Sequence, residues 1–184
     1  MAILLNEIFG TAISLCAFSL LASAGYHKLN PVNRDYYIDV VRGYNFSLPL
    51  SASMVVFGIA LVEVVAALLV SVPSTRSVGL VLGAFLMFFY GGVMTIVYWR
   101  GARDISCGCG GPGQESVISP LLFVRNLVLG LAFLLAVPAG LASSWETAGL
   151  GMLLALGLVL FYLSMEQLLQ NDVKLKNIKQ MRKL

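Results

Sequence analysis

Long apolar segments alternate with shorter polar ones along the whole chain. Five of them have a length close to the about 20 apolar residues that a helix needs to cross a bilayer. They cover residues 8–25, 51–72, 78–99, 119–141 and 147–165. Each is expected to be helical, because an isolated strand in lipid leaves its backbone groups without hydrogen bonds. The pattern predicts an all-α integral membrane protein with a four-helix transmembrane core bundle and a fifth, peripheral C-terminal span.

The polar connections between these segments divide into three regions. Residues 26–50 contain Pro31, Asn33 and several charged side chains, and they predict an interfacial helix from about 33 to 44 that covers one end of the bundle. Residues 100–118 carry two cysteines, and residues 167–184 form a polar tail that is expected to begin as a helix. Because little chain is left for a soluble domain, residues 1–184 are interpreted as a single transmembrane domain.

The composition agrees with this interpretation. Of the 184 residues, 59% are hydrophobic and 11% are charged, and the mean hydropathy is +0.88, values typical of membrane proteins. The net charge of +3 does not indicate nucleic-acid binding, because the basic residues are not interleaved with aromatic ones; the basic tail is expected to contact membrane lipid. The first segment ends in a sequence similar to a signal-peptidase site, but Glu7 and no Lys or Arg precede it, which favours a retained span.

The placement of Lys and Arg predicts an orientation. With five spans, one side of the membrane carries Lys28, Arg34, Arg42, Arg100, Arg103, Lys174, Lys176, Lys179, Arg182 and Lys183. The opposite side carries Arg76 alone. The positive-inside rule therefore places the N-terminus outside the cell and the two cysteines of the third connection in the cytoplasm. Cytoplasmic thiols are normally kept reduced, which conflicts with a role in delivering disulfides.

The sequence Cys107-Gly108-Cys109 is the strongest indication of chemistry. A disulfide across one residue needs the backbone freedom of glycine and is expected to be strained, because the preferred Cα separation is about 5.5–6 Å. Strained disulfides are the labile and catalytic ones, so Cys107 and Cys109 are the predicted catalytic pair. Arg103 and the start of the following helix favour a thiolate there. The alternatives are a tight turn with unreactive thiols and a soft-metal site.

Charged residues inside apolar segments are candidates for function. Glu63 lies in the second segment, and Arg125 and Asn126 lie about two turns into the fourth. An ion pair between Glu63 and Arg125 is expected to neutralise both. One interpretation is a structural lock of the bundle; the other is that Arg125 or Asn126 binds the polar head of a ligand or stabilises a thiolate.

The remaining polar candidates are weaker. His27, the one histidine, is either a proton shuttle or an interfacial anchor. No metal cofactor is expected, because structural zinc needs four ligands and the chain has three cysteines, of which Cys16 is expected to be buried in the first span. Pairs of small residues four positions apart, Gly79 with Gly83 and Gly151 with Ala155, predict close helix packing.

Several of these residues together resemble the MauE family of methylamine-utilisation membrane proteins. The resemblance covers roughly residues 10–140 and rests on Tyr26-His-Lys-Leu-Asn-Pro31, Glu63, Arg100-Gly101, Asp104-Ile-Ser-Cys-Gly-Cys-Gly110, Ile118-Ser119 and Arg125-Asn126. It implies a bacterial inner-membrane protein that helps to mature periplasmic methylamine dehydrogenase, whose small subunit is dense in disulfides. It also implies a thioredoxin-like partner, MauD, and places the two cysteines in the periplasm, opposite to the charge rule.

The arrangement is also similar to DoxX-like bundles, vitamin K epoxide reductase and DsbB, which suggests electron transfer to a ubiquinone-type quinone by analogy of architecture. The function predicted is therefore a quinone-linked thiol oxidoreductase, with Arg125 and Asn126 at the quinone and with Glu63, Arg103 and His27 in support. The alternatives are a non-catalytic membrane scaffold for the maturation partner and a small metal or cation carrier that uses Glu63 and the thiols as ligands.

Overall fold

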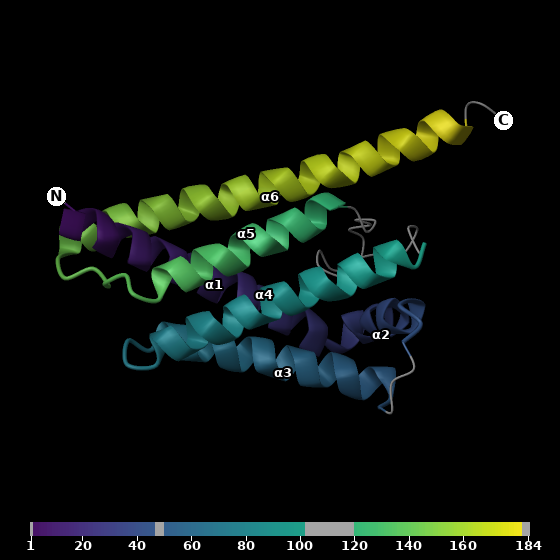
Figure 1. The fold of residues 1–184 in the computed structure, drawn as a ribbon, viewed down its shortest axis with the longest axis horizontal. Helices are drawn as coiled ribbons and strands as arrows, with labels where there is room; N and C mark the ends of the chain where they lie inside the picture. The colour runs from purple at the N-terminus through teal and green to yellow at the C-terminus, as the bar shows by residue number, and fades with distance from the viewer. Residues whose placement is uncertain (1, 47–49, 102–119, 182–184) are drawn as a thin grey trace.

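The computed structural model describes residues 2–46, 50–101 and 120–181, and every regular element in these ranges is helical (Figure 1). The elements are α1 (Ala2–Leu29), the 3-10 turn η1 (Pro31–Asn33), α2 (Arg34–Gly43), α3 (Ala52–Ser71), α4 (Arg76–Trp99), α5 (Pro120–Ala136) and α6 (Trp145–Met181). The long helices α1, α3, α4 and α6 are apolar and long enough to cross a membrane, and α5 is apolar but shorter. The predicted all-α, multi-pass membrane protein is confirmed.

The fourth apolar segment ends earlier than its hydropathy predicts. A span over residues 119–141 was expected, but α5 stops at Ala136. Pro138 lacks an amide hydrogen and disfavours helical backbone at Val137, so the helix ends before the apolar sequence does. With 17 residues, α5 is about 26 Å long at about 1.5 Å per residue.

The helices form a core bundle with one peripheral member. Among the described elements, α1 packs on both α3 and α6, and α4 packs on α3 and α5, whereas α6 packs its backbone closely on α1 alone. Only 11% of the most apolar stretch of α6 is buried, compared with 33–44% in the other three long helices. Figure 1 shows α6 running past the end of the bundle toward the C-terminus. The expected peripheral C-terminal helix is present, and it continues well into the polar tail.

The short helix α2 lies close to where an interfacial helix was expected, one residue inside the predicted bounds at each end. Its buried residues Tyr37 and Val40 face the bundle, and Asp39 and Arg42 on its other face are exposed. The helix contacts α1 and α3. It therefore covers the end of the bundle where α1 ends and α3 begins.

The predicted close packing at small residues is confirmed at three glycines. A Cβ atom at Gly79 would lie 2.5 Å from the backbone nitrogen of Val70, so α3 and α4 touch there. One at Gly83 would lie 3.1 Å from the Leu21 side chain, and one at Gly151 would lie 3.0 Å from Thr11. These glycines bring α1, α4 and α6 close to their neighbours.

At the far end of the bundle, Arg76 is a buried cross-link rather than a surface charge. Its side chain is 5% exposed, and its guanidinium donates hydrogen bonds to Ser14 Oγ (2.7 Å) and to the carbonyl oxygens of Gly10 (3.3 Å), Ala136 (2.7 Å) and Ala139 (2.8 Å). The last two carbonyls lie at the C-terminal end of α5, where a positive charge is favoured by the helix dipole. Arg76 thus ties α4 to α1 and α5.

Candidate functional site

A cavity of about 520 Å³ lies inside the bundle and is lined by residues from α1 to α6. Most of its wall is apolar and comes from side chains such as Leu20, Val56, Ile59, Met87 and Leu129. The charged and amide side chains in the wall are His27, Lys28, Glu63, Arg125, Asn126 and Glu166. Since a membrane interior offers polar groups no water, the concentration of charged side chains at one cavity marks it as the candidate site.

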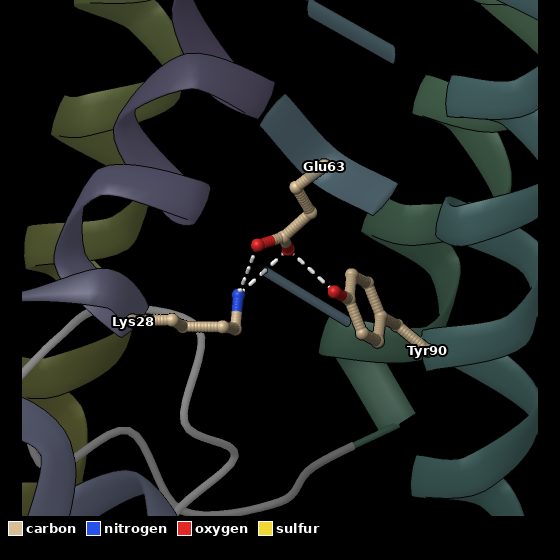
Figure 2. A network of polar contacts seen from close by, with 3 residues as sticks. All are labelled: Lys28, Glu63 and Tyr90. Carbon is tan, nitrogen blue, oxygen red and sulfur yellow. Dashed lines mark hydrogen bonds and ion pairs between the residues drawn. The ribbon is translucent and has the colours of Figure 1, made fainter. Parts of the chain in front are cut away.

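The first polar cluster joins three helices at Glu63 (Figure 2). The Glu63 side chain is fully buried, and its two carboxylate oxygens accept hydrogen bonds from Lys28 Nζ at 2.6 and 2.9 Å. The Tyr90 hydroxyl from α4 donates a short hydrogen bond to the same carboxylate. Lys28 Nζ also lies 5.5 Å from the centre of the Tyr90 ring. The buried carboxylate is therefore neutralised by a cation and held by a phenol.

The predicted ion pair between Glu63 and Arg125 is wrong, since Glu63 pairs with Lys28. The reason is the close approach of α1 to α3 at Gly25, where a Cβ atom would lie 2.7 Å from Val64 Cγ2 and 3.4 Å from Glu63 Cβ. Lys28 is three residues further along the same face of α1, so its side chain reaches Glu63. No pattern within α1 alone identifies Glu63 as the partner, because the pairing depends on how α1 approaches α3.

Arg125 instead belongs to a second polar cluster, with residues of α6. Its guanidinium forms a short ion pair with Glu166, and its centre lies 5.3 Å from the centre of the Tyr162 ring. Both partners of the pair are largely buried, with side-chain exposures of 13% for Arg125 and 6% for Glu166. The pair connects α5 to α6 across the cavity, although the backbones of these two helices are not closely packed.

Asn126 lies beside Arg125 and is 2% exposed. Its Nδ2 group donates a hydrogen bond to the Met94 sulfur at 3.7 Å, and this is the bond that its side chain makes with the described residues. A thioether is a weak acceptor, so the described residues leave much of the donor capacity of this amide unused. Glu166 is similar, because its Oε1 atom is buried and accepts no hydrogen bond from the described part of the chain.

His27 lies in the cavity wall at the end of α1, with an exposed side chain. Its ring contacts the Tyr26 ring edge-on at 5.8 Å between centres, and its carbonyl oxygen accepts a hydrogen bond from Asn33 Nδ2 at 3.2 Å. The structure places His27 near Lys28 but tests neither a shuttle nor an anchor role, so both stay predictions.

The predicted catalytic residues Cys107 and Cys109, together with Arg103, lie outside the described residues. Their segment connects the C-terminal end of α4 to the N-terminal end of α5. The cavity reaches both of these helix ends, because Ile96 and Arg125 are among its lining residues. The third cysteine, Cys16, is 5% exposed within α1, in agreement with the expected burial.

Sequence comparisons identify the family. The family described as methylamine utilisation protein MauE matches residues 6–139. A curated relative, the methylamine utilization protein MauE of Paracoccus denitrificans, is 30% identical over 148 residues, which cover 79% of this chain and 78% of the relative. No solved structure matches the chain. The matched region spans α1 to α5 and contains both members of the Cys-Gly-Cys pair, as well as Lys28, Glu63, Tyr90, Arg125 and Asn126. The chain therefore belongs to the MauE family of methylamine utilisation proteins.

Proposed function

We propose that this membrane protein is a thiol–disulfide oxidoreductase of the bacterial inner membrane, in which Cys107 and Cys109 cycle between a dithiol and a disulfide. Its partner is a thioredoxin-like periplasmic protein of the MauD kind. Its client is the disulfide-rich small subunit of methylamine dehydrogenase. Membership of a family named for methylamine utilisation supports the client, and the Cys-Gly-Cys sequence supports the chemistry.

The reaction has two balanced steps. First, the Cys107–Cys109 disulfide accepts two electrons and two protons from the dithiol of the partner, whose own disulfide forms. Second, the resulting dithiol transfers two electrons and two protons to a membrane quinone, so that the two S–H bonds break, the S–S bond forms again and the quinone becomes a quinol. In the sequence Arg103 precedes Cys107 by four residues, and a nearby positive charge favours the thiolate that thiol exchange requires.

The observation that carries this proposal is the cavity at the end of the bundle where the Cys-Gly-Cys segment joins α4 to α5. A lipid-soluble electron acceptor needs an apolar site with a few polar groups in its wall. The cavity has that composition, with Asn126, Arg125 and Lys28 as possible hydrogen-bond donors to quinone oxygens. The donor set suits an organic carbonyl compound, which needs donors, better than a metal cation, because both carboxylates of the wall are already paired with Lys28 and Arg125.

The test replaces each cysteine by serine in a host that depends on this chain to mature methylamine dehydrogenase. Cys107→Ser and Cys109→Ser are each expected to abolish maturation, measured as disulfide content and activity of the small subunit. Cys16→Ser is the matched control, because Cys16 is buried within α1 and is expected to leave maturation unchanged. Full maturation with either of the first two variants would overturn the redox function and favour the scaffold.

The orientation is tested on intact cells in the Cys16→Ser background. We propose that Cys107 and Cys109 face the periplasm, although the basic residues favour the opposite orientation. A membrane-impermeant maleimide is then expected to label them after mild reduction and without permeabilisation. Labelling that requires permeabilisation would place the pair in the cytoplasm and contradict disulfide delivery to a periplasmic client.

A further inference from the structure

The ionised groups of the cavity are balanced within the wall. Lys28 is paired with Glu63, and Arg125 is paired with Glu166. Each pair has no net charge, so the ion pairs among the described wall residues offer neither an anion nor a cation an unpaired counter-charge. Moving an ion into such a buried site is unfavourable, because its charge would lose its hydration and find no counter-charge. The occupant that fits the cavity is therefore a neutral molecule, which excludes anionic lipid headgroups and free cations.

The described residues leave part of the hydrogen-bonding capacity of Asn126 and Glu166 unused. The Asn126 amide donates to a thioether, which is a weak acceptor. The Glu166 carboxylate has an oxygen that accepts no hydrogen bond from the described residues. A buried polar group without a hydrogen-bond partner is destabilising. A ligand that both accepts from Asn126 and donates to Glu166 removes both costs.

We infer that the cavity is a selective site for the reduced, quinol form of a membrane quinone, with Asn126 donating to one ring oxygen and the Glu166 carboxylate accepting from a ring hydroxyl. This inference deepens the proposed function and rests on it for the electron transfer. A quinone accepts hydrogen bonds at its carbonyl oxygens but has no hydroxyl to donate. Glu166 therefore distinguishes the two redox forms, whereas Asn126 binds both.

The size and wall of the cavity fit such a ligand. Its volume of about 520 Å³ lies within the range of about 300–1,000 Å³ for ligand sites. The apolar side chains of α3 and α4 in the wall, among them Ile59 and Val93, suit the ring face and the first part of an isoprenoid tail. At the cavity, α5 and α6 are joined by the side chains of Arg125 and Glu166 rather than by backbone packing.

Selectivity for the quinol gives the site a redox role. Any site that binds the reduced form of a couple more tightly makes the bound oxidised form a stronger oxidant. One hydrogen bond to a charged acceptor strengthens binding by about tenfold or more. For a two-electron couple a tenfold ratio raises the midpoint potential by about 30 mV. The bound quinone is thereby favoured as acceptor of the electrons of the Cys107–Cys109 dithiol, whose two protons complete the quinol.

The experiment measures binding without turnover. The full-length protein carrying Cys107→Ser and Cys109→Ser is purified in detergent and titrated anaerobically by calorimetry with three probes: decylubiquinone, decylubiquinol and the dimethyl ether of decylubiquinol. The ether keeps the ring and the tail but cannot donate a hydrogen bond. The quinol is expected to bind at least about tenfold more tightly than either other probe. Equal affinity of the quinol and the quinone, or of the quinol and its ether, would overturn the inference.

Variants locate the effect in the cavity. Glu166→Gln removes the charge of the acceptor and is expected to reduce the quinol-to-quinone affinity ratio at least threefold, and Asn126→Leu is expected to weaken both forms alike. The matched controls are Glu146→Gln and Asn6→Leu, which make the same changes at exposed positions outside the cavity and are expected to leave both affinities unchanged. If Glu166→Gln fails to fold, the comparison of the three probes on the unaltered cavity still decides.

Failure of this inference is distinguishable from failure of the proposed function. The binding assay contains no reactive pair, so its result does not depend on whether Cys107 and Cys109 are catalytic. If quinol selectivity is absent but both cysteines are required for maturation, the thiol chemistry stands and the cavity assignment is wrong. If the cysteines are dispensable but the selectivity is present, the cavity is a quinol-binding site and the proposed thiol oxidation at Cys107 and Cys109 is wrong.

Discussion

Removal of the Glu63 carboxylate is expected to destabilise the bundle strongly. In Glu63→Gln the ammonium of Lys28 loses both hydrogen bonds to a negative charge, which measure 2.6 and 2.9 Å, and Tyr90 loses a charged acceptor. Breaking one side of a buried ion pair costs about 3–5 kcal/mol. Because the Lys28 side chain is 13% exposed and can move toward the membrane surface, the lower end of that range, about 3 kcal/mol, is expected.

The assay is the free energy of unfolding of the purified protein, from denaturant titration in mixed micelles followed by circular dichroism. The control is Asp39→Asn, which breaks the ion pair with Arg42 on the outer face of α2. That pair is 3.4 Å long, and its side chains are 73% and 70% exposed, so a loss below about 0.5 kcal/mol is expected. The two variants make the same chemical change at a buried and at an exposed carboxylate.

A double substitution separates the charge from the packing. In Lys28→Met combined with Glu63→Leu no charge is left unpaired, and replacing a buried pair by apolar residues is often neutral or stabilising. The double variant is expected to recover at least half of the loss seen in Glu63→Gln. The reasoning is refuted if Glu63→Gln costs no more than Asp39→Asn, because the carboxylate would then not be supporting a buried cation.

Two further predictions use the same titration. Arg76→Met leaves three backbone carbonyl oxygens without their donor, each at a cost of about 1–3 kcal/mol, so a total loss of at least about 3 kcal/mol is expected. A loss below about 1 kcal/mol, the cost of one such bond, would contradict the cross-link. Gly79→Ala places a Cβ atom 2.5 Å from the Val70 backbone and is expected to cost about 1–3 kcal/mol. Gly92→Ala, where a Cβ atom meets nothing within 4 Å, is expected to be neutral or stabilising by up to about 1 kcal/mol.

The sequence predicted the helices well because one physical requirement acts on every span. In lipid the backbone N–H and C=O groups must be hydrogen-bonded within the protein, and a helix achieves this. The prediction failed at the end of α5, where the apolar pattern continues to residue 141 but Pro138 ends the helix at Ala136. Hydropathy measures the preference of side chains for lipid, and it does not register the loss of one amide hydrogen. Pro138 was visible in the sequence, but the prediction gave more weight to the length of the apolar segment than to the effect of a proline on the helix.

The candidate site was predicted only in part, for a different reason. Glu63, Arg125 and Asn126 were found because they interrupt apolar segments, where polar residues are rare. Lys28 and Glu166 were missed because both lie just beyond the predicted ends of spans, at positions where a charged residue ordinarily reaches the membrane surface. Which cation meets which carboxylate depends on the approach of helices that are distant in sequence, and single-helix patterns do not contain that information.

The pairing of Lys28 with Glu63 and of Arg125 with Glu166 in the cavity wall has an electrical consequence. A charge that moves through the membrane field gains or loses about 2.3 kcal/mol per 100 mV. With Lys28 beside Glu63 and Arg125 beside Glu166, a neutral occupant enters and leaves without displacing net charge along that field. If the proposed occupant is neutral, its occupancy of the cavity is therefore expected not to depend on the membrane potential.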